Sequence, residues 1–330
     1  MRKTLLGLAL LAGVAGAEMP SPSILLDSRA VSIGVVHARP DDTGFKEMLK
    51  TAWETMRARE GGGATFLDLI SSFLSRATQE NILLGFLPFQ GVRIDHIDEK
   101  GRDRASFMVT AAGWPGIQGL FWNTLLNGPD GKPYPTEAVG RDTLVIRPKV
   151  GQAVEDAPAV ARKDGTFYSF ADVETARRIL EKKDLVNPAI STVLAELNQD
   201  SDTYGVLINR QQSLYRFLTW VNRRDFETVK QAVGEEKLLK AFEHVEVVTW
   251  QGDLVSDDRM DMQVRFRTDN PEQALQLEEV LSTARSALAE KGRTGDLQMT
   301  SVDQDVLVDI QFQGYRKMMV DYLQRGSKKS

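Results

Sequence analysis

The chain contains no cysteine, and it has only three histidines among its 330 residues. The absence of cysteine excludes disulfides, thiol nucleophiles and cysteine-ligated metals. The sequence also lacks an HExxH helix, a Gly-x-Ser-x-Gly elbow, a P-loop and a dinucleotide-binding fingerprint. We therefore expect no cofactor and no metal site, although an active site assembled from distant residues stays open.

Long apolar runs are also scarce, and the most apolar one lies near the N-terminus. Arg2 and Lys3 precede an apolar run from Leu5 to Val14, which is followed by Ala15-Gly16-Ala17. A permanent membrane span needs about 20 apolar residues, so this run is too short for one. The pattern predicts a cleavable signal peptide over 1–17, and hence a periplasmic or secreted bacterial protein with no transmembrane segment in the mature chain. An uncleaved anchor and a buried first helix are the alternatives.

The chain has no excess of basic residues. Removal of Arg2 and Lys3 lowers the basic count from 41 to 39 against 46 acidic residues, so the formal charge goes from −5 to −7. Nucleic-acid partners normally require a basic surface, so we expect none. The 313 residues left after subtraction of 17 from 330 are enough for two domains with their own cores.

The second half repeats the pattern of the first. Both halves start with a strand, at 32–36 and 203–207, that leads into helices with apolar residues at helical spacing. Two strands follow in each half, at 92–96 and 106–110 and at 245–249 and 260–266. A proline then opens a helix in each half, at Pro115 and Pro271, a position where proline is well tolerated.

Each half closes with a matching segment that we read as a strand. Residues 139–145, VGRDTLV, and residues 302–308, VDQDVLV, share four identities in seven positions. The order strand, helix, strand, strand, helix, strand therefore occurs twice. It predicts an α+β fold of two tandem βαββαβ modules, ferredoxin-like with a split βαβ arrangement, each with an antiparallel sheet and helices on one face. Chance similarity of two α+β halves is the alternative.

These patterns define the expected domains. The first module covers 18–186 and includes a crossover loop at 150–162, a short aromatic strand and a helix. The second module covers 187–314. A C-terminal helix and basic tail cover 315–330, in which Met318, Met319 and Tyr322 share an apolar stripe.

The central third of the chain resembles a family of uncharacterised exported bacterial proteins with a duplicated α+β architecture. The resemblance is carried by the run 164–170, the helix containing Glu174-Thr175-Ala176, the segment 188–197 and the strand 204–208. It implies the architecture only, because the family offers no catalytic residue to transfer.

Few residues are candidates for a site. His96 and Asp98 would share a face of a strand and could hold a metal ion or a proton, although a surface histidine beside an acid is commonplace. Arg265 and Arg267 mark an open sheet face that could dock a partner or an acidic ligand, and the stripe at 315–325 could dock another protein or a membrane surface. The aromatic residues that could line an apolar cleft between the modules are Trp114, Phe121 and Trp122.

We expect a non-catalytic exported protein of the cell envelope that acts as a protein-interaction or structural module. The alternatives are a periplasmic carrier of an apolar small molecule, held between the two modules, and a hydrolase with a non-local site. The sequence leaves the question of enzymatic activity open and favours the absence of one.

Overall fold

The computed structural model describes residues 21–22, 26–38, 44, 46–47, 89–97, 103–111, 122, 126–127, 132–148, 151–163, 166–181, 187–221, 223–256, 258–290 and 296–314. The described part is α+β, with twelve strands and six helices. The chain divides into two compact units. The first consists of Met1–Ala30, Val35–Asn187 and Leu323–Ser330, and the second of Val31–Gly34 and Pro188–Tyr322.

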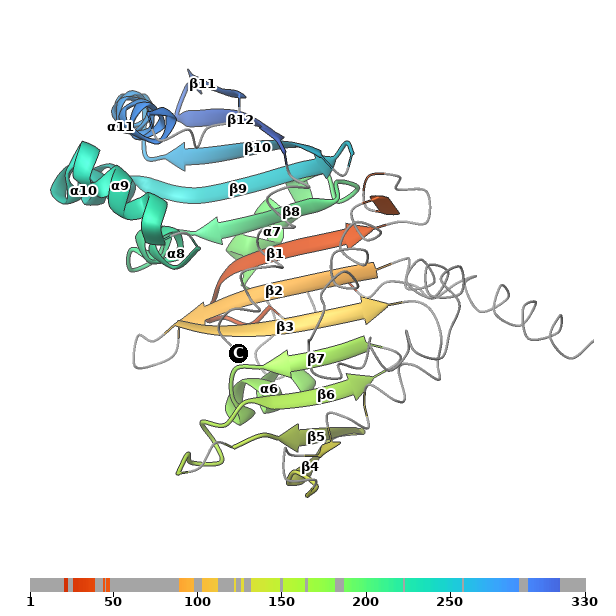
Figure 1. Ribbon diagram of the computed structural model, residues 1–330. Coiled ribbons are helices and arrows are strands. Elements are labelled where there is room, and N and C mark those ends of the chain that lie inside the picture. Colours follow the sequence, from red (N-terminus) through yellow and green to blue (C-terminus); the bar gives the residue numbers. More distant parts are fainter. Residues whose placement is uncertain are drawn as a thin grey trace, which may run out of the picture. The chain divides into compact units, whose positions relative to one another are not determined.

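The first unit contains a sheet with the strand order β1-β2-β3-β7-β6-β5-β4 (Figure 1). Its strands are β1 (Ala30–Ala38), β2 (Phe89–Ile97), β3 (Asp103–Ala111), β4 (Thr136–Val139), β5 (Asp142–Ile146), β6 (Ala159–Lys163) and β7 (Thr166–Phe170). In this order, every pair of neighbours from β2 through β3, β7, β6 and β5 to β4 is antiparallel. Val31–Gly34, in the first half of β1, count with the second unit.

One face of this sheet forms the core of the first unit. Val92 and Ile94 of β2 are buried, and they lie opposite Met108 and Ser106 of β3. The helix α6 (Val173–Leu180) contacts β5, β6 and β7. It begins where the side chain of Asp172 accepts a hydrogen bond from the backbone N–H of Thr175, 2.7 Å away, which satisfies an amide that the first turn leaves open.

The second unit contains a sheet with the order β11-β12-β10-β9-β8. Its strands are β8 (Thr203–Ile208), β9 (Val245–Leu254), β10 (Arg259–Thr268), β11 (Asp296–Val302) and β12 (Asp305–Gln313). Its helices are α7 (Pro188–Glu196), α8 (Ser213–Val221), α9 (Arg223–Val233), α10 (Glu235–Glu243) and α11 (Pro271–Ala289). α11 begins at Pro271, as the sequence predicts, with Asn270 as its N-cap.

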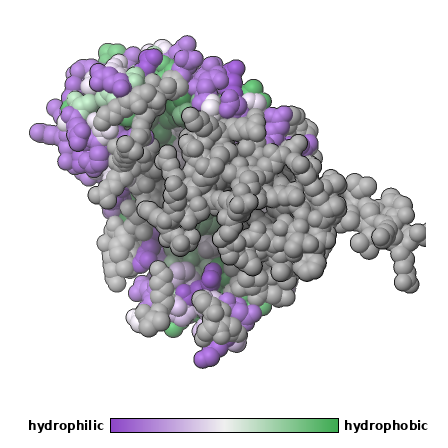
Figure 2. Space-filling view, in the orientation of Figure 1, coloured by the Kyte–Doolittle hydropathy of each residue, from purple (hydrophilic) through white to green (hydrophobic). Residues whose placement is uncertain are grey.

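Helices α8 to α11 and one face of this sheet enclose a single apolar core. The sheet contributes Leu207, Val248 and Val306, and α11 contributes Leu277 and Val280, all nearly without exposed surface. The outer surface of α9 to α11 is mostly hydrophilic (Figure 2), which fits the amphipathic spacing of these helices.

The strand order differs from the ferredoxin-like one that the sequence suggested. In a split βαβ module, the first and third strands are parallel neighbours at the centre of the sheet. Here β8 pairs with β9, β9 with β10, and β10 with β12, all antiparallel. After β8, helices α8 to α10 lead the chain back to β9, which lies beside β8. β8 and β9 are therefore antiparallel neighbours, and none of these three pairs is parallel. In the first unit, the β6–β7 hairpin lies between β3 and β5.

The matched closing segments are hairpins and not single strands. Val139 pairs with Asp142 between β4 and β5, and Val302 pairs with Asp305 between β11 and β12. Each turn starts with a residue of positive φ, 61° at Gly140 and 53° at Asp303. Glycine and aspartate tolerate a positive φ better than most residues, so the chain can reverse at these positions. The alternation of apolar residues continues on both sides of the reversal.

Two glycines of the second unit make room for the indole of Trp250. A Cβ on Gly205 would lie 2.2 Å from a ring carbon of Trp250 and 2.4 Å from the carbonyl oxygen of Ile33. A Cβ on Gly34 would lie 3.3 Å from the same ring carbon. The indole also stacks on Phe217, with ring centroids 6.3 Å apart. The indole of Trp250 thus joins β9 to α8 across β8, where Gly205 has no side chain to obstruct it.

We predict that Gly205→Ala lowers the free energy of unfolding by about 2 kcal/mol or more, because its methyl group must displace backbone or a packed ring. Gly34→Ala is the matched control, and we expect it to cost less than about 1 kcal/mol, because the ring needs to move only slightly. Urea unfolding followed by tryptophan fluorescence measures both. Equal stability losses in the two variants would contradict the close approach at Gly205.

Candidate functional site

The structure places some of the predicted site residues. Trp122 is half-buried in the first unit, and its ring lies 6.4 Å from that of Phe167. Phe167 belongs to β7, so Trp122 packs on the sheet of its own unit. The remaining predicted residues Asp98, Trp114, Phe121, Met318, Met319 and Tyr322 lie outside the described residues.

Arg265 and Arg267 lie on β10, and both form ion pairs with Asp305 of β12. Arg265 donates a hydrogen bond to one carboxylate oxygen of Asp305, and Nε of Arg267 lies 3.5 Å from the other. The Asp305 side chain is 14% exposed, against 40% and 30% for the two arginines. Since one carboxylate offsets part of their charge, the two arginines form a compensated cluster of the sheet and a weaker anion site than we expected.

His96 is not the surface histidine that the sequence suggested. It is 1% exposed on the core face of β2, and its Nδ1 lies 2.9 Å from Oδ1 of Asp27. Asp27 is also 1% exposed and lies just before β1. The two residues are 69 positions apart, and both lie in the first unit.

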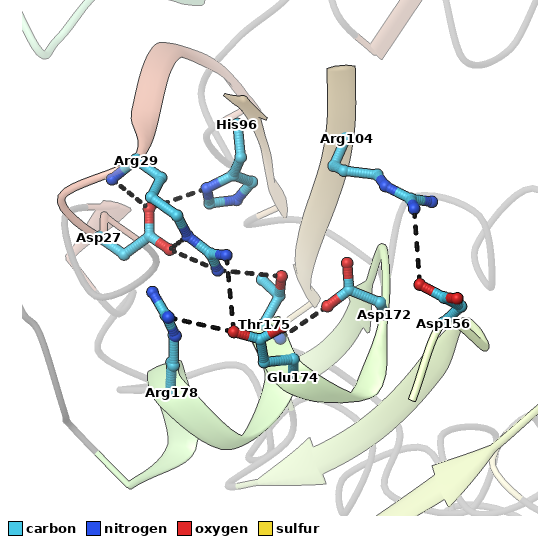
Figure 3. Close-up of polar contacts among 9 residues, drawn as sticks. All are labelled: Asp27, Arg29, His96, Arg104, Asp156, Asp172, Glu174, Thr175 and Arg178. Carbon is cyan, nitrogen blue, oxygen red and sulfur yellow. Dashed lines mark hydrogen bonds and ion pairs between the residues drawn. The ribbon is translucent and has the colours of Figure 1, made fainter. Parts of the chain in front are cut away.

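Arg29 links this pair to α6 (Figure 3). Its backbone N–H donates to Oδ1 of Asp27 at 3.0 Å, and its guanidinium lies 3.3 Å from Oδ2. The same guanidinium donates to Oγ1 of Thr175 at 3.4 Å and lies 3.9 Å from Glu174, which also pairs with Arg178 at 3.0 Å. The network therefore connects the segment before β1, the end of β2 and the first turn of α6.

The Asp27 carboxylate is stabilised in its charged form. Burial raises the pKa of Asp27, but the hydrogen bond from His96 and the charges of His96 and Arg29 lower it by more, so the pKa of this carboxyl falls below its usual 3.8. An ionised carboxylate only accepts hydrogen bonds, so Nδ1 of His96 carries a proton.

This geometry has one chemical implication. A carboxylate that fixes Nδ1–H leaves Nε2 of a neutral imidazole as a base or a metal ligand, as in catalytic dyads and metal sites. Among the described residues, the buried Nε2 of His96 has no hydrogen-bond partner, and neither has the hydroxyl of Ser106, which lies on the same face of the neighbouring strand. Asp27, His96 and Ser106 have almost no exposed surface, and the described residues contain no group that could hold a metal ion.

The opposite face of the same sheet carries aromatic and guanidinium side chains. Arg93 of β2 lies over the ring of Phe107, 5.6 Å from its centroid, and pairs with Asp95 at 2.6 Å. Arg162 of β6 lies 5.7 Å from the ring of Phe167 in the same way. Phe107 is 41% exposed, although it lies on a strand in the interior of the sheet. Aromatic rings and guanidinium groups thus recur on this outer face.

Sequence reasoning missed Asp27 and Phe107 for different reasons. Asp27 lies outside every element that the repeat defined, and no local spacing links it to His96. Phe107 belongs to a strand that we predicted, and its alternation with Ser106 and Met108 leaves open which face is covered. In the structure, Ser106 and Thr110 are buried together with Met108, so Phe107 lies on the uncovered face.

We predict that Asp27→Asn lowers the free energy of unfolding at neutral pH by about 2–3 kcal/mol, since a hydrogen-bonded buried charge is lost. A carboxyl with a lowered folded pKa stabilises above its unfolded pKa, near 3.8, and loses that contribution as pH falls through the folded value. Urea unfolding from about pH 7 to about pH 3 should therefore show the difference between variant and parent shrinking in acid. The exposed Asp253→Asn is the control, and a pH-independent difference for Asp27→Asn would contradict the ion pair.

Comparisons with known proteins add little. No family model matches the chain, and no curated protein matches it either. A solved structure, crystal form I of TP0453, matches at 9% sequence identity with a TM-score of 0.41, covering 93% of this chain and 98% of that one. Within the described residues, no helix combines the length and apolarity needed to cross a membrane.

Proposed function

We propose that the protein is a non-catalytic, exported protein of the cell envelope that binds a protein partner through the outer face of the first unit's sheet. The observation that carries the proposal is Phe107, a large aromatic side chain that is 41% exposed in the interior of a sheet. The surface around it is formed by Arg93, Phe107, Trp122, Arg162 and Phe167, and we call it the aromatic face.

The composition of the aromatic face favours a protein as the partner. Aromatic residues and arginine are enriched in protein interfaces and in the few positions that dominate binding energy. The guanidinium of Arg93 is held both by Asp95 and by the ring of Phe107. A side chain that is already fixed loses less conformational freedom when a partner binds, which supports affinity.

A hydrolase is the second candidate, because Asp27, His96 and Ser106 offer an acid, an imidazole and a hydroxyl on one core face. Their burial argues against it, since a substrate must come within hydrogen-bond distance of the base and nucleophile. The network instead suits a structural role, in which it fastens the segment before β1 to β2 and α6.

Internal duplication remains part of the proposal in a changed form. Without the β6–β7 hairpin, the first unit has the order β1-β2-β3-β5-β4, which corresponds to β8-β9-β10-β12-β11. The residue after each closing turn forms an ion pair towards a neighbouring strand, Asp142 with Lys163 and Asp305 with Arg267. We propose that the units are copies of one module and that the hairpin was inserted into the first.

Export predicts a definite N-terminus. Expressed with its first 17 residues in a bacterium, the protein should be recovered outside the cytoplasm with a mature chain that starts at Glu18. Intact mass and N-terminal sequencing of the fractionated cells measure this. Recovery of the full-length chain in the cytoplasm would contradict export, and Ala17→Leu, which removes a small residue that the peptidase reads, should abolish cleavage.

Loss of the Phe107 ring should remove the partner. In gentle purifications from the cell envelope, native mass spectrometry should find a bound protein with the parent chain and at least about tenfold less of it with Phe107→Asp. Val255→Asp is the matched control, since Val255 is 55% exposed and lies in the second unit. Equal recovery with both variants would overturn the proposed surface, and a co-purifying small molecule without a protein would favour the carrier alternative.

A further inference from the structure

The sheet of the second unit ends in β11, whose outer edge pairs with no other described strand. Among the described strands, β11 pairs with β12 alone. The pairing runs through all seven residues of β11 without a register shift. The outer N–H and C=O groups of such a strand are a template for another strand.

β11 lacks the features by which proteins usually protect such edges. Its sequence, DLQMTSV, contains no proline and no lysine, and its one charge, Asp296, lies at its end. The end strand of the first unit's sheet is different, because β4 has only four residues and follows Pro133 and Pro135. An edge of seven residues without a bulge or an interior charge indicates a partner strand.

We propose that two copies of this chain dimerise by antiparallel pairing of β11 with β11, around a two-fold axis at Met299. In this register Gln298 lies opposite Thr300 of the second copy, and Asp296 lies opposite Val302. Two amide–hydroxyl pairs then flank the axis, and no like charges face each other. A two-fold interface must be self-complementary in this way.

The side chains of α11 support the same axis. The hydroxyl of Ser301 in β11 donates a hydrogen bond to Glu278 of α11, which fixes the helix against the strand. A strand rises by about 3.4 Å per residue and a helix by about 1.5 Å, so two strand residues span about 4.5 helix residues. α11 precedes β11 in the chain, and we take the two to run in opposite directions. Met299 therefore lies level with the region of Ser282.

Glu278 and Arg285 lie on either side of that level, about two turns apart on the same side of the helix. The two-fold axis brings Glu278 of one copy towards Arg285 of the other, twice. Arg285 is exposed and has no ion pair within the described part of the chain. The complementary charges favour a second copy over an extended peptide of another protein, which would satisfy the edge of β11 but not both residues of α11.

The adjacent surface of α11 is exposed. An open hollow of about 450 Å³ lies along it, lined by Leu275, Glu278, Glu279, Ser282, Thr283 and Ser286. Leu275 is 62% exposed at one end of it. Packed helices lie about 8–10 Å apart, which small side chains such as serine permit. Dimerisation would cover this part of α11 together with the strand edge.

The first test uses the mature chain, residues 18–330, in analytical ultracentrifugation over a range of concentrations. We expect a monomer–dimer equilibrium that the double variant Gln298→Lys/Thr300→Lys weakens at least about tenfold, because lysines then oppose lysines across the axis. The control is Gln231→Lys/Ala232→Lys, two exposed positions of α9 with the same added charge. A monomer at every concentration, or a dimer that withstands the lysines in β11, would overturn the proposal.

The second test exchanges the charges of α11. Glu278→Arg and Arg285→Glu should each weaken the dimer about three- to tenfold, and the double exchange should restore it, since the pairs across the axis then re-form. Circular dichroism and thermal unfolding establish that each variant is folded. Additive losses in the double variant would rule out the proposed pairing of these residues.

The register has its own test, because the chain contains no cysteine of its own. Met299→Cys should form a disulfide-linked dimer on mild oxidation, since residues opposite each other in a sheet lie within disulfide reach. Val302→Cys is the control. Val302 is 50% exposed, but in this register its counterpart lies about 20 Å away. Efficient cross-linking at Val302 and none at Met299 would contradict the axis.

Discussion

The buried hydrogen bond between His96 and Asp27 is the interaction on which the first unit depends most. It joins residues 69 positions apart at almost no exposed surface. Its partners allow each other to be buried: the imidazole and Arg29 stabilise the carboxylate, while the carboxylate fixes the ring and orders the guanidinium towards α6. A buried pair of this kind adds little net stability over an apolar pair, yet removal of one member leaves an uncompensated charge. Its value is positional, since it fixes where the segment before β1 lies.

The same principle of compensation separates the two outer sheet faces. On the second unit, Asp305 pairs with Arg265 and Arg267, and Asp261 pairs with Arg259 at 2.6 Å, so carboxylates offset part of the charge of these arginines. On the first unit, Arg93 also pairs with Asp95, but Arg93 and Arg162 lie over aromatic rings as well, and the ring of Phe107 leaves apolar surface in contact with water. A face of that kind gains free energy when a partner covers it. This difference, more than any motif, is the reason to place binding on the first unit.

Local sequence features predicted local structure well. The capped start of α11 at Asn270-Pro271 and the alternating strands around 92–96 and 260–266 are found, since each depends on a few neighbouring residues. Strand order was not predictable in this way, because the same alternation fits a ferredoxin-like module and the antiparallel order observed. The turns at Gly140 and Asp303 were missed because a two-residue reversal preserves the alternation of apolar residues. Asp27 was missed because only the fold brings it to His96.

The corrected topology also explains why the two end strands differ. If β4 and β11 are equivalent strands of a duplicated module, both inherited an edge position next to a closing hairpin. An edge strand must be protected or paired, because it otherwise recruits other chains. In the first unit, β4 is shortened and preceded by prolines, which protects it. In the second unit, β11 kept seven residues, a single terminal charge and an exposed helix beside it. Such a strand persists under selection when its edge has a regular partner, and the partner with the matching register and charge is a second copy of the chain.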